Sequence, residues 1–226
     1  MIEVKTLRTI PLFMDLRDEE LAELARLCQM KTLEKDKIIF MEEDAGEYFY
    51  VVLKGKVKIA IEGEGGKEVI LSWLCEGDYF GEMALLDDEP RSATAVAAES
   101  TDLLLLKRQE FLRILKAHPS FMLRVFTILS RRVRRANHQI ASLALLDVYG
   151  RVARVLMDLA MEEGKRLKDG RIQLKLPARR EIANMIGTSR ETVTRVLAGL
   201  AKQGYLENLG RVVILNESFP KTGKAA

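Results

Sequence analysis

The chain has 226 residues, of which 48% are hydrophobic and 31% are charged, with 36 Lys and Arg against 33 Asp and Glu. This composition excludes a disordered chain and allows one large domain or two modest ones. We find neither a membrane-spanning run of roughly 20 apolar residues nor a secretory pattern at residues 1–8. We therefore expect a cytoplasmic protein with no membrane partner.

The charge is unevenly distributed along the chain. Residues 1–146 carry 21 basic and 24 acidic side chains, whereas residues 147–226 carry 15 and 9. A basic C-terminal part next to a mildly acidic front predicts that the C-terminal part contacts a polyanion.

Cysteine and histidine are scarce, which limits the chemistry available to the chain. Cys28 and Cys75 are far apart and lack CxxC spacing, and the histidines are His118 and His138. A zinc site or an iron–sulfur cluster needs about four ligands, so we expect no metal site and two buried, reduced thiols. No Ser/His/Asp set or paired-carboxylate pocket can be assembled either, so we expect no enzyme.

The N-terminal half predicts a short helix followed by many strands. Residues 16–29 form an amphipathic pattern with acidic residues in the first turn, where the helix dipole favours them. From Lys37 to Lys107 the hydrophobic period changes to two, and the clearest strands are residues 48–53, 57–61 and 68–74. A glycine-rich turn at 62–66 lacks the Lys-Ser/Thr ending of a phosphate loop. This pattern predicts an antiparallel sandwich or closed roll.

From Arg108 onward the pattern is helical and contains a long apolar seam. The apolar residues are spaced alternately by four and three, at Met122, Phe126, Leu129, Val133, Ala136, Ile140 and Leu143. This is the a/d spacing of a coiled coil. The seam can pack on its own domain or on a second copy of the helix, and its strict alternation favours the second. We therefore predict a homodimer, whose two-fold symmetry suits many DNA sites.

The segment after the seam predicts a second, smaller domain. Asp147 to Gly150 ends the seam, and Gly150 is a predicted hinge because glycine tolerates backbone angles that other residues avoid. The elements expected beyond it are a helix at 151–163, a turn at 168–170, a strand at 172–176, two helices, and a hairpin flanking Gly210.

Residues 181–197 fit a helix-turn-helix. Gly187 allows the tight turn, and Thr188 with Glu191 forms a predicted capping box. The outward side chains at the front of the second helix are Arg190, Glu191, Thr194 and Arg195, where a reader of the major groove needs them. Arg can bond guanine O6 and N7, and Glu can accept from cytosine N4. The alternative is an ordinary helical hairpin with a polar outer face. The hairpin after Gly204 predicts a wing, with Arg211 near phosphates.

Residues 80–95 predict a cradle for a small phosphate. Gly81 and Glu82 begin a turn or short helix whose N–H groups suit an anion. Arg91 can bind a phosphate bidentately, Ser92 can donate its hydroxyl, and Glu82 can accept from a sugar hydroxyl. The apolar residues that exclude water from this loop are Leu85, Leu86, Ala93 and Ala95. The alternative is an Arg–Glu ion pair that closes a loop.

These segments together resemble the cyclic AMP receptor protein (catabolite activator) family of bacterial transcription regulators, along nearly the whole chain. The matching motifs are Gly55 in Lys-Gly-Lys-Val, the cassette 81–93, residues 143–151 and residues 189–195. The resemblance implies an α+β chain with three parts. These are a cyclic nucleotide-binding antiparallel β-roll (jelly roll) at 1–115, a dimerisation helix at 116–147 and a winged helix-turn-helix at 148–226.

The resemblance also implies a cyclic AMP site. Its implied ligand-binding residues are Gly81, Glu82, Met83, Ala84, Arg91, Ser92, Ala93 and Asn137. Glu82 would bind the ribose 2′-hydroxyl, and Arg91 and Ser92 the cyclic phosphate. In the family, two polar residues of the dimer helix contact the adenine. Here these positions hold Ala136, which cannot bond a base, and Asn137, which can bond adenine N6.

The partners implied by the resemblance are double-stranded DNA, a second copy of the chain and RNA polymerase. The implied DNA-binding residues are Arg179, Ser189, Arg190, Glu191, Thr194, Arg195 and Arg211, and the expected sites are palindromes of TGTGA type. One alternative is a regulator of this family that responds to another ligand, such as a haem bound by Cys75 or His138, or to none. Another is a nucleotide-binding regulatory subunit of a protein partner, which would not need a recognition helix.

Overall fold

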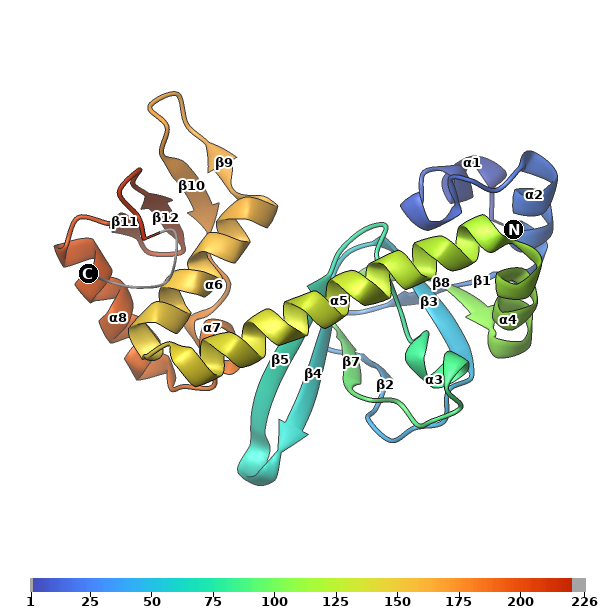
Figure 1. The fold of residues 1–226 in the computed structure, drawn as a ribbon, viewed down its shortest axis with the longest axis horizontal. Coiled ribbons are helices and arrows are strands. Elements are labelled where there is room, and N and C mark those ends of the chain that lie inside the picture. The colour runs from blue at the N-terminus through green and yellow to red at the C-terminus, as the bar shows by residue number, and fades with distance from the viewer. Residues whose placement is uncertain (1, 221–226) are drawn as a thin grey trace. The chain divides into compact units, whose positions relative to one another are not determined.

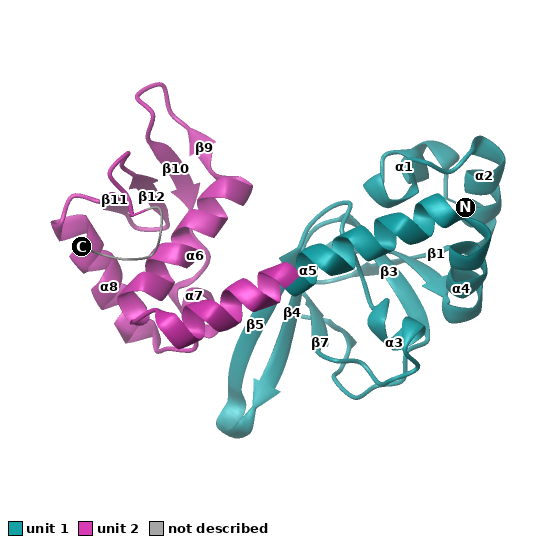
Figure 2. Cartoon of the chain, viewed as in Figure 1, with its two compact units in different colours: residues 1–133 teal, residues 134–226 magenta. Residues whose placement is uncertain are grey.

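The computed structural model describes residues 2–220, and the chain divides into two compact units, residues 1–133 and 134–226 (Figures 1 and 2). The boundary lies inside the longest helix, α5 (Pro119–Leu145). The first part of α5 belongs to the N-terminal unit because Phe121 and Val125 are buried in that unit's core. The three-part division expected from the sequence treats this helix as a separate piece. Residues 221–226 of the expected C-terminal part lie outside the described residues.

Two four-stranded antiparallel sheets form the roll predicted from the period-two pattern. One sheet has the order β1 (Gln29–Leu33), β8 (Thr101–Lys107), β3 (Tyr48–Lys54) and β6 (Tyr79–Phe80). The other has the order β2 (Ile38–Phe40), β7 (Thr94–Ala97), β4 (Val57–Gly63) and β5 (Lys67–Leu74). A single 3₁₀ turn, Glu64–Gly66, joins β4 to β5 where the glycine-rich turn was expected.

The central strand β3 is buried on both faces, which gives the N-terminal unit two cores. Its odd-numbered residues, Phe49 and Val51, pack with the helices, and Tyr50 and Val52 pack with residues of the second sheet. Successive side chains of a strand point to opposite faces, so one strand serves both cores. The strand β6 has the same division, because Tyr79 belongs to the first core and Phe80 to the second.

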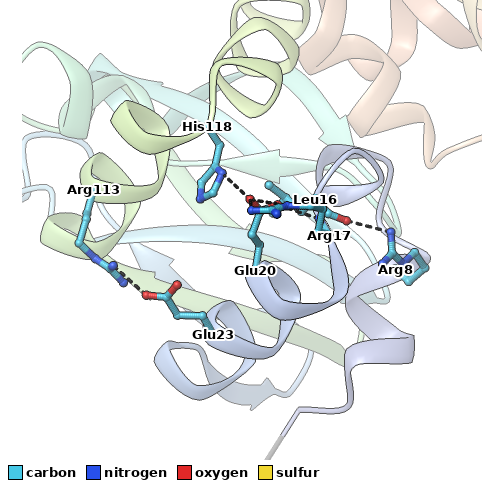
Figure 3. Close-up of polar contacts among 7 residues, drawn as sticks. All are labelled: Arg8, Leu16, Arg17, Glu20, Glu23, Arg113 and His118. Atoms are coloured by element: carbon cyan, nitrogen blue, oxygen red, sulfur yellow. Dashed lines mark hydrogen bonds and ion pairs between the residues drawn. The ribbon is translucent and has the colours of Figure 1, made fainter.

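Short helices cover the open face of the first sheet. They are α1 (Val4–Arg8), the 3₁₀ helix Pro11–Phe13, α2 (Asp18–Leu27) and α4 (Arg108–Ala117). Figure 3 shows the polar contacts among them: Glu23 pairs with Arg113 at 2.8 Å, and Glu20 lies 3.2 Å from Nδ1 of His118, between α4 and α5. These contacts join α2 to α4 and to the residue that precedes the long helix.

The C-terminal unit is a winged helix-turn-helix. Its helices are α6 (Val148–Glu163), α7 (Arg179–Ile186) and α8 (Arg190–Lys202). Its sheet has the order β11 (Leu206–Leu209), β12 (Val212–Leu215), β10 (Ile172–Lys175) and β9 (Lys165–Arg166). The turn between β11 and β12 contains Gly210, as expected, at φ +82°.

The sequence analysis predicted a hinge at Gly150 because of glycine's backbone freedom, and the structure contradicts that reason. Gly150 lies in the first turn of α6, is buried, and is not among the described glycines with positive φ. The helical path breaks one turn earlier, at Leu146 and Asp147. The Asp147 carboxylate caps α6 by accepting from the Gly150 N–H at 2.8 Å. The sequence therefore contains a helix stop and restart here, with an aspartate as the new N-cap.

Candidate functional site

The predicted cradle lies where β6 leads into the one-turn helix α3 (Met83–Leu86), next to Arg91 and Ser92, which precede β7. Gly81 has φ +80°, and a Cβ there would lie 2.8 Å from Nη1 of Arg91 and 3.2 Å from the Tyr48 carbonyl oxygen. The glycine is therefore required twice, for its backbone angle and for the approach of the arginine.

Arg91 is held as a fixed, buried cation. The residue is only 4% exposed. Nη1 donates to the Gly81 carbonyl oxygen at 2.6 Å, and Nη2 donates to the Tyr48 carbonyl oxygen at 2.7 Å. The guanidinium lies 4.3 Å from the centre of the Phe40 ring, and burial lowers the pKa of Arg91. The Nε atom of Arg91 is buried and has no hydrogen-bond partner among the described residues. A buried N–H without a partner is costly unless a ligand completes it.

Glu82 is buried as well and leaves one carboxylate oxygen unpaired. It is 1% exposed; Oε1 accepts from Nη1 of Arg132 at 2.6 Å, and Oε2 is buried without a partner among the described residues. The ion pair that involves this glutamate therefore joins it to Arg132 of α5, and the alternative of an Arg–Glu pair within the loop is wrong. Arg91 instead uses backbone carbonyls.

Arg132 is a site residue that sequence reasoning missed. It also donates to the Tyr79 carbonyl oxygen, and its guanidinium lies 5.0 Å from the centre of the Tyr79 ring. The hydroxyl of Tyr79 donates to the Val125 carbonyl oxygen at 2.9 Å, and burial raises the pKa of Tyr79. Arg132 follows Val125 by about two helical turns and lies on the same helix face. That spacing from an apolar core position was the available signal.

The remaining cradle residues divide into a dry base and an exposed rim. Ala84 and Ala93 are buried, whereas Met83 is 47% exposed and Ser92 is exposed, with its Oγ 3.8 Å from the Met83 sulfur. Helix α3 has only four residues, so its dipole is small. The side chains of Arg91 and Glu82 therefore carry more of the site than the predicted helix N-terminus does.

Asn137 and Ala136 are exposed on α5, in the part of the helix that belongs to the second unit. The other predicted nucleotide ligands belong to the first unit. The assignment of Asn137 as a contact to the adenine base therefore stays a prediction.

The helix-turn-helix has the predicted faces and a different cap. Gly187 has φ +65°. The N-cap of α8 is Ser189, whose hydroxyl accepts from the Thr192 N–H at 3.2 Å, so the predicted capping box of Thr188 and Glu191 is wrong. The apolar face of α8 is buried at Val193, Val196, Leu197 and Leu200. The four side chains predicted to read bases are exposed: Arg190, Glu191, Thr194 and Arg195.

Arg211 and Arg179, the other two predicted DNA-binding arginines, differ in their surroundings. Arg211 is exposed at the turn of the wing. Arg179 directs its guanidinium to the same turn, where Nη2 donates to the Gly210 carbonyl oxygen at 2.9 Å.

The sequence analysis predicted two buried thiols, and the structure shows that this prediction is wrong for one of them. Burial raises the pKa of Cys28 to about 12, whereas Cys75 is exposed because it follows the end of β5. Within residues 2–220 there is no group of three or more His, Cys, Asp or Glu that could hold a metal. Among the same residues, no helix is both long enough and apolar enough to span a bilayer.

Comparison with known proteins separates the same two parts. Residues 30–118 match the family model of the cyclic nucleotide-binding domain, and residues 150–218 match that of the Crp-like helix-turn-helix domain. The chain is 38% identical to the cyclic AMP receptor protein of Thermus thermophilus over 196 residues, which cover 87% of this chain and 88% of that protein.

Two solved structures share the fold. One is a variant of CooA from Carboxydothermus hydrogenoformans, with a TM-score of 0.77 at 26% identity, covering 87% of each chain. The other is the c-di-GMP-responsive global regulator CLP of Xanthomonas campestris, with a TM-score of 0.76 at 24% identity, covering 88% of this chain and 98% of that one. At that identity the second likeness concerns the fold alone.

Proposed function

Because the chain belongs to the cyclic AMP receptor protein family of transcription regulators, which are not enzymes, we propose that it is a cytoplasmic homodimer that binds palindromic DNA when a cyclic mononucleotide is bound. The favoured effector is cyclic AMP. The family also makes RNA polymerase a proposed partner. The Crp-like helix-turn-helix disfavours the alternative of a regulatory subunit for another protein.

The observation that carries the sensing half of this proposal is the pair of buried, unpartnered polar atoms in the cradle. Nε of Arg91 is a donor with a positive charge, and Oε2 of Glu82 is an acceptor with a negative charge. A cyclic nucleotide offers an anionic phosphate oxygen to the first and a ribose 2′-hydroxyl to the second. The two carbonyls that hold Arg91 organise it for such a bond before the ligand arrives.

The proposed response is a population shift in the arrangement of the DNA-binding units. Glu82 and Tyr79 are both joined to α5, through Arg132 and Val125, so a ligand in the cradle acts directly on this helix. The break at Leu146 and Asp147 separates α5 from α6 and is the proposed point of movement. A tenfold gain in DNA affinity requires a coupling of only about 1.4 kcal/mol.

Another effector in the same cradle is the main alternative, and Ala136 favours it. Its methyl side chain has no donor or acceptor for a base, so one of the two expected base contacts is missing. The cradle itself would select a cyclic phosphate and ribose whichever base they carry.

Titration calorimetry with cyclic AMP and with cyclic GMP tests the sensing proposal, and operator binding with and without each nucleotide tests the response. We expect cyclic AMP to bind more tightly and to raise affinity for a TGTGA-type palindrome. If neither nucleotide gives a heat of binding while the protein still binds the operator, the proposal of a cyclic nucleotide effector is wrong. The chain would then be a regulator of this family that responds to another signal or to none.

Replacing Arg190 or Arg195 with Ala should cost about 1–3 kcal/mol of operator affinity and relax the preference at one base pair, because each guanidinium can fork to a guanine. A binding-selection experiment with randomised half-sites measures both effects. Lys202→Ala, at the exposed far end of α8, is the control and should keep the base preference. An unaltered preference in both arginine variants would contradict the assigned reading residues.

A further inference from the structure

We propose that Arg179 is a positioning residue for the wing and not a contact to a DNA phosphate. The inference rests on the proposed binding of DNA by the winged helix-turn-helix. It also revises the role that the family resemblance implied for this residue. Nη2 of this side chain already has an acceptor inside the protein, at the turn between β11 and β12.

Arg179 is the first residue of α7, and its guanidinium spans the space from that helix to the wing. Nη2 donates to the Gly210 carbonyl oxygen at 2.9 Å and lies 3.4 Å from Oδ1 of Asn208. Burial lowers the pKa of Arg179, although an arginine stays charged at neutral pH. The charged donor therefore strengthens its bond to the carbonyl.

The turn that Arg179 binds is itself built around that contact. Oδ1 of Asn208 accepts from the Gly210 N–H at 3.2 Å, and Gly210 has φ +82°. The same carboxamide oxygen thus faces both the turn and the guanidinium. Loss of Arg179 removes the side-chain donor to the Gly210 carbonyl oxygen and leaves the local Asn208 contact at that residue.

The rest of the wing is fastened elsewhere, which isolates the contribution of Arg179. The Leu176 N–H donates to the Arg211 carbonyl oxygen at 2.7 Å, and Arg171 pairs with Glu207 of β11 at 2.5 Å. Leu176 directly follows β10, and Arg171 directly precedes it. Arg179 alone among these residues joins the wing turn to the helix-turn-helix helices.

The wing turn presents a different arginine to the solvent. Arg211 is exposed, and its side chain has no hydrogen bond or ion pair with any residue in the described part of the chain. Leu209, next to the turn, is 62% exposed. Arg211 is thus free to meet a phosphate, and Arg179 fixes the turn that carries it. A contact held in place before binding loses less conformational entropy on binding.

A double-mutant cycle on operator affinity distinguishes positioning from direct contact. Residues that act through one another give non-additive losses, and independent phosphate contacts add. We expect Arg211→Ala to weaken binding about fivefold in the wild-type background and less than twofold in the Arg179→Ala background. Arg180→Ala is the matched control, because Arg180 is the exposed neighbour on α7, and its effect should add to that of Arg211→Ala.

Amide hydrogen exchange in the free protein tests the same inference without DNA. The amides of residues 209–212 should exchange at least about tenfold faster in Arg179→Ala than in the wild type or in Arg180→Ala. Arg179→Lys keeps the charge, but its ammonium reaches less far than Nη2 of arginine, so it should not restore protection.

The inference is overturned by unchanged exchange at the wing. It is also overturned by additive losses in the cycle together with a salt slope lowered by about one, the signature of one lost phosphate contact. If the wild-type chain binds no operator, the proposed function fails, while the exchange experiment still decides whether Arg179 holds the wing.

Discussion

Replacing Arg91 with Gln is expected to weaken cyclic AMP binding by about two orders of magnitude or more. The phosphate loses its charge-assisted donor, which is worth about 1.5–3 kcal/mol, and loses the neutralising charge as well. The effect is large because the guanidinium is held by the carbonyl oxygens of Gly81 and Tyr48 and does not have to be ordered by the ligand. Titration calorimetry measures the change.

Controls separate binding from folding. Arg26→Gln changes an exposed arginine at the end of α2 and should leave affinity unchanged. Arg91 also stacks on Phe40, so the thermal midpoint of each variant must show a folded protein at the titration temperature. Arg91→Lys keeps the charge but has no Nε–H and no fork, and we expect it to recover only part of the affinity. A folded Arg91→Gln variant with wild-type affinity would remove the cradle as the nucleotide site.

The spacing of hydrophobic residues predicted most of the fold, because the strands and helices that form the cores show their buried faces in the local sequence pattern. The apolar run at 48–53 marked β3, which is buried on both faces, and the spacing of four and three marked α5. Gly81 and Arg91 were both named from the sequence, because they belong to the cassette 81–93 that resembles the family. The structure adds the reason, because a Cβ at position 81 would meet the arginine itself.

The missed features depend on contacts between residues distant in the chain. Arg132 reaches Glu82 across 50 positions, and Arg179 reaches Gly210 across 31. No periodicity links such pairs, and an arginine on a helix otherwise reads as a solvated side chain. The error at Thr188 has a different cause. Adjacent Thr and Ser both suit an N-cap, and the choice depends on which residue the αL conformation of Gly187 places at the helix start.

The seam of α5 leaves several large apolar side chains exposed in the single chain. At the start of the seam, Met122 and Leu129 are partly buried against the core of the N-terminal unit. Further along, Phe126, Val133 and Ile140 are 48, 61 and 63% exposed. A contiguous exposed apolar stripe at a/d spacing is an interaction surface, and a second copy of the same helix is the partner whose pattern matches it.

Combining Val133→Asp with Ile140→Asp is therefore expected to yield a monomer and to lower operator affinity by about a thousandfold. Each aspartate replaces a side chain whose burial is worth about 1.5–3 kcal/mol, and in a dimer each carboxylate would face its own copy across the seam. A monomer can engage only one half-site of a palindrome and loses the second recognition helix. Sedimentation velocity measures the mass, and operator titration measures the affinity.

Thr127→Asp is the control for this variant, because Thr127 is exposed on α5 next to the seam position of Phe126 and outside the a/d pattern. It adds an aspartate to the same helix and should leave the protein dimeric. The apolar face and the DNA-reading face lie in different elements, α5 and α8, so loss of operator affinity without loss of the dimer would show that the aspartates act on DNA by another route. Retention of the dimer by the double variant would mean that the two copies meet through another surface, and the exposed seam would then need a different partner.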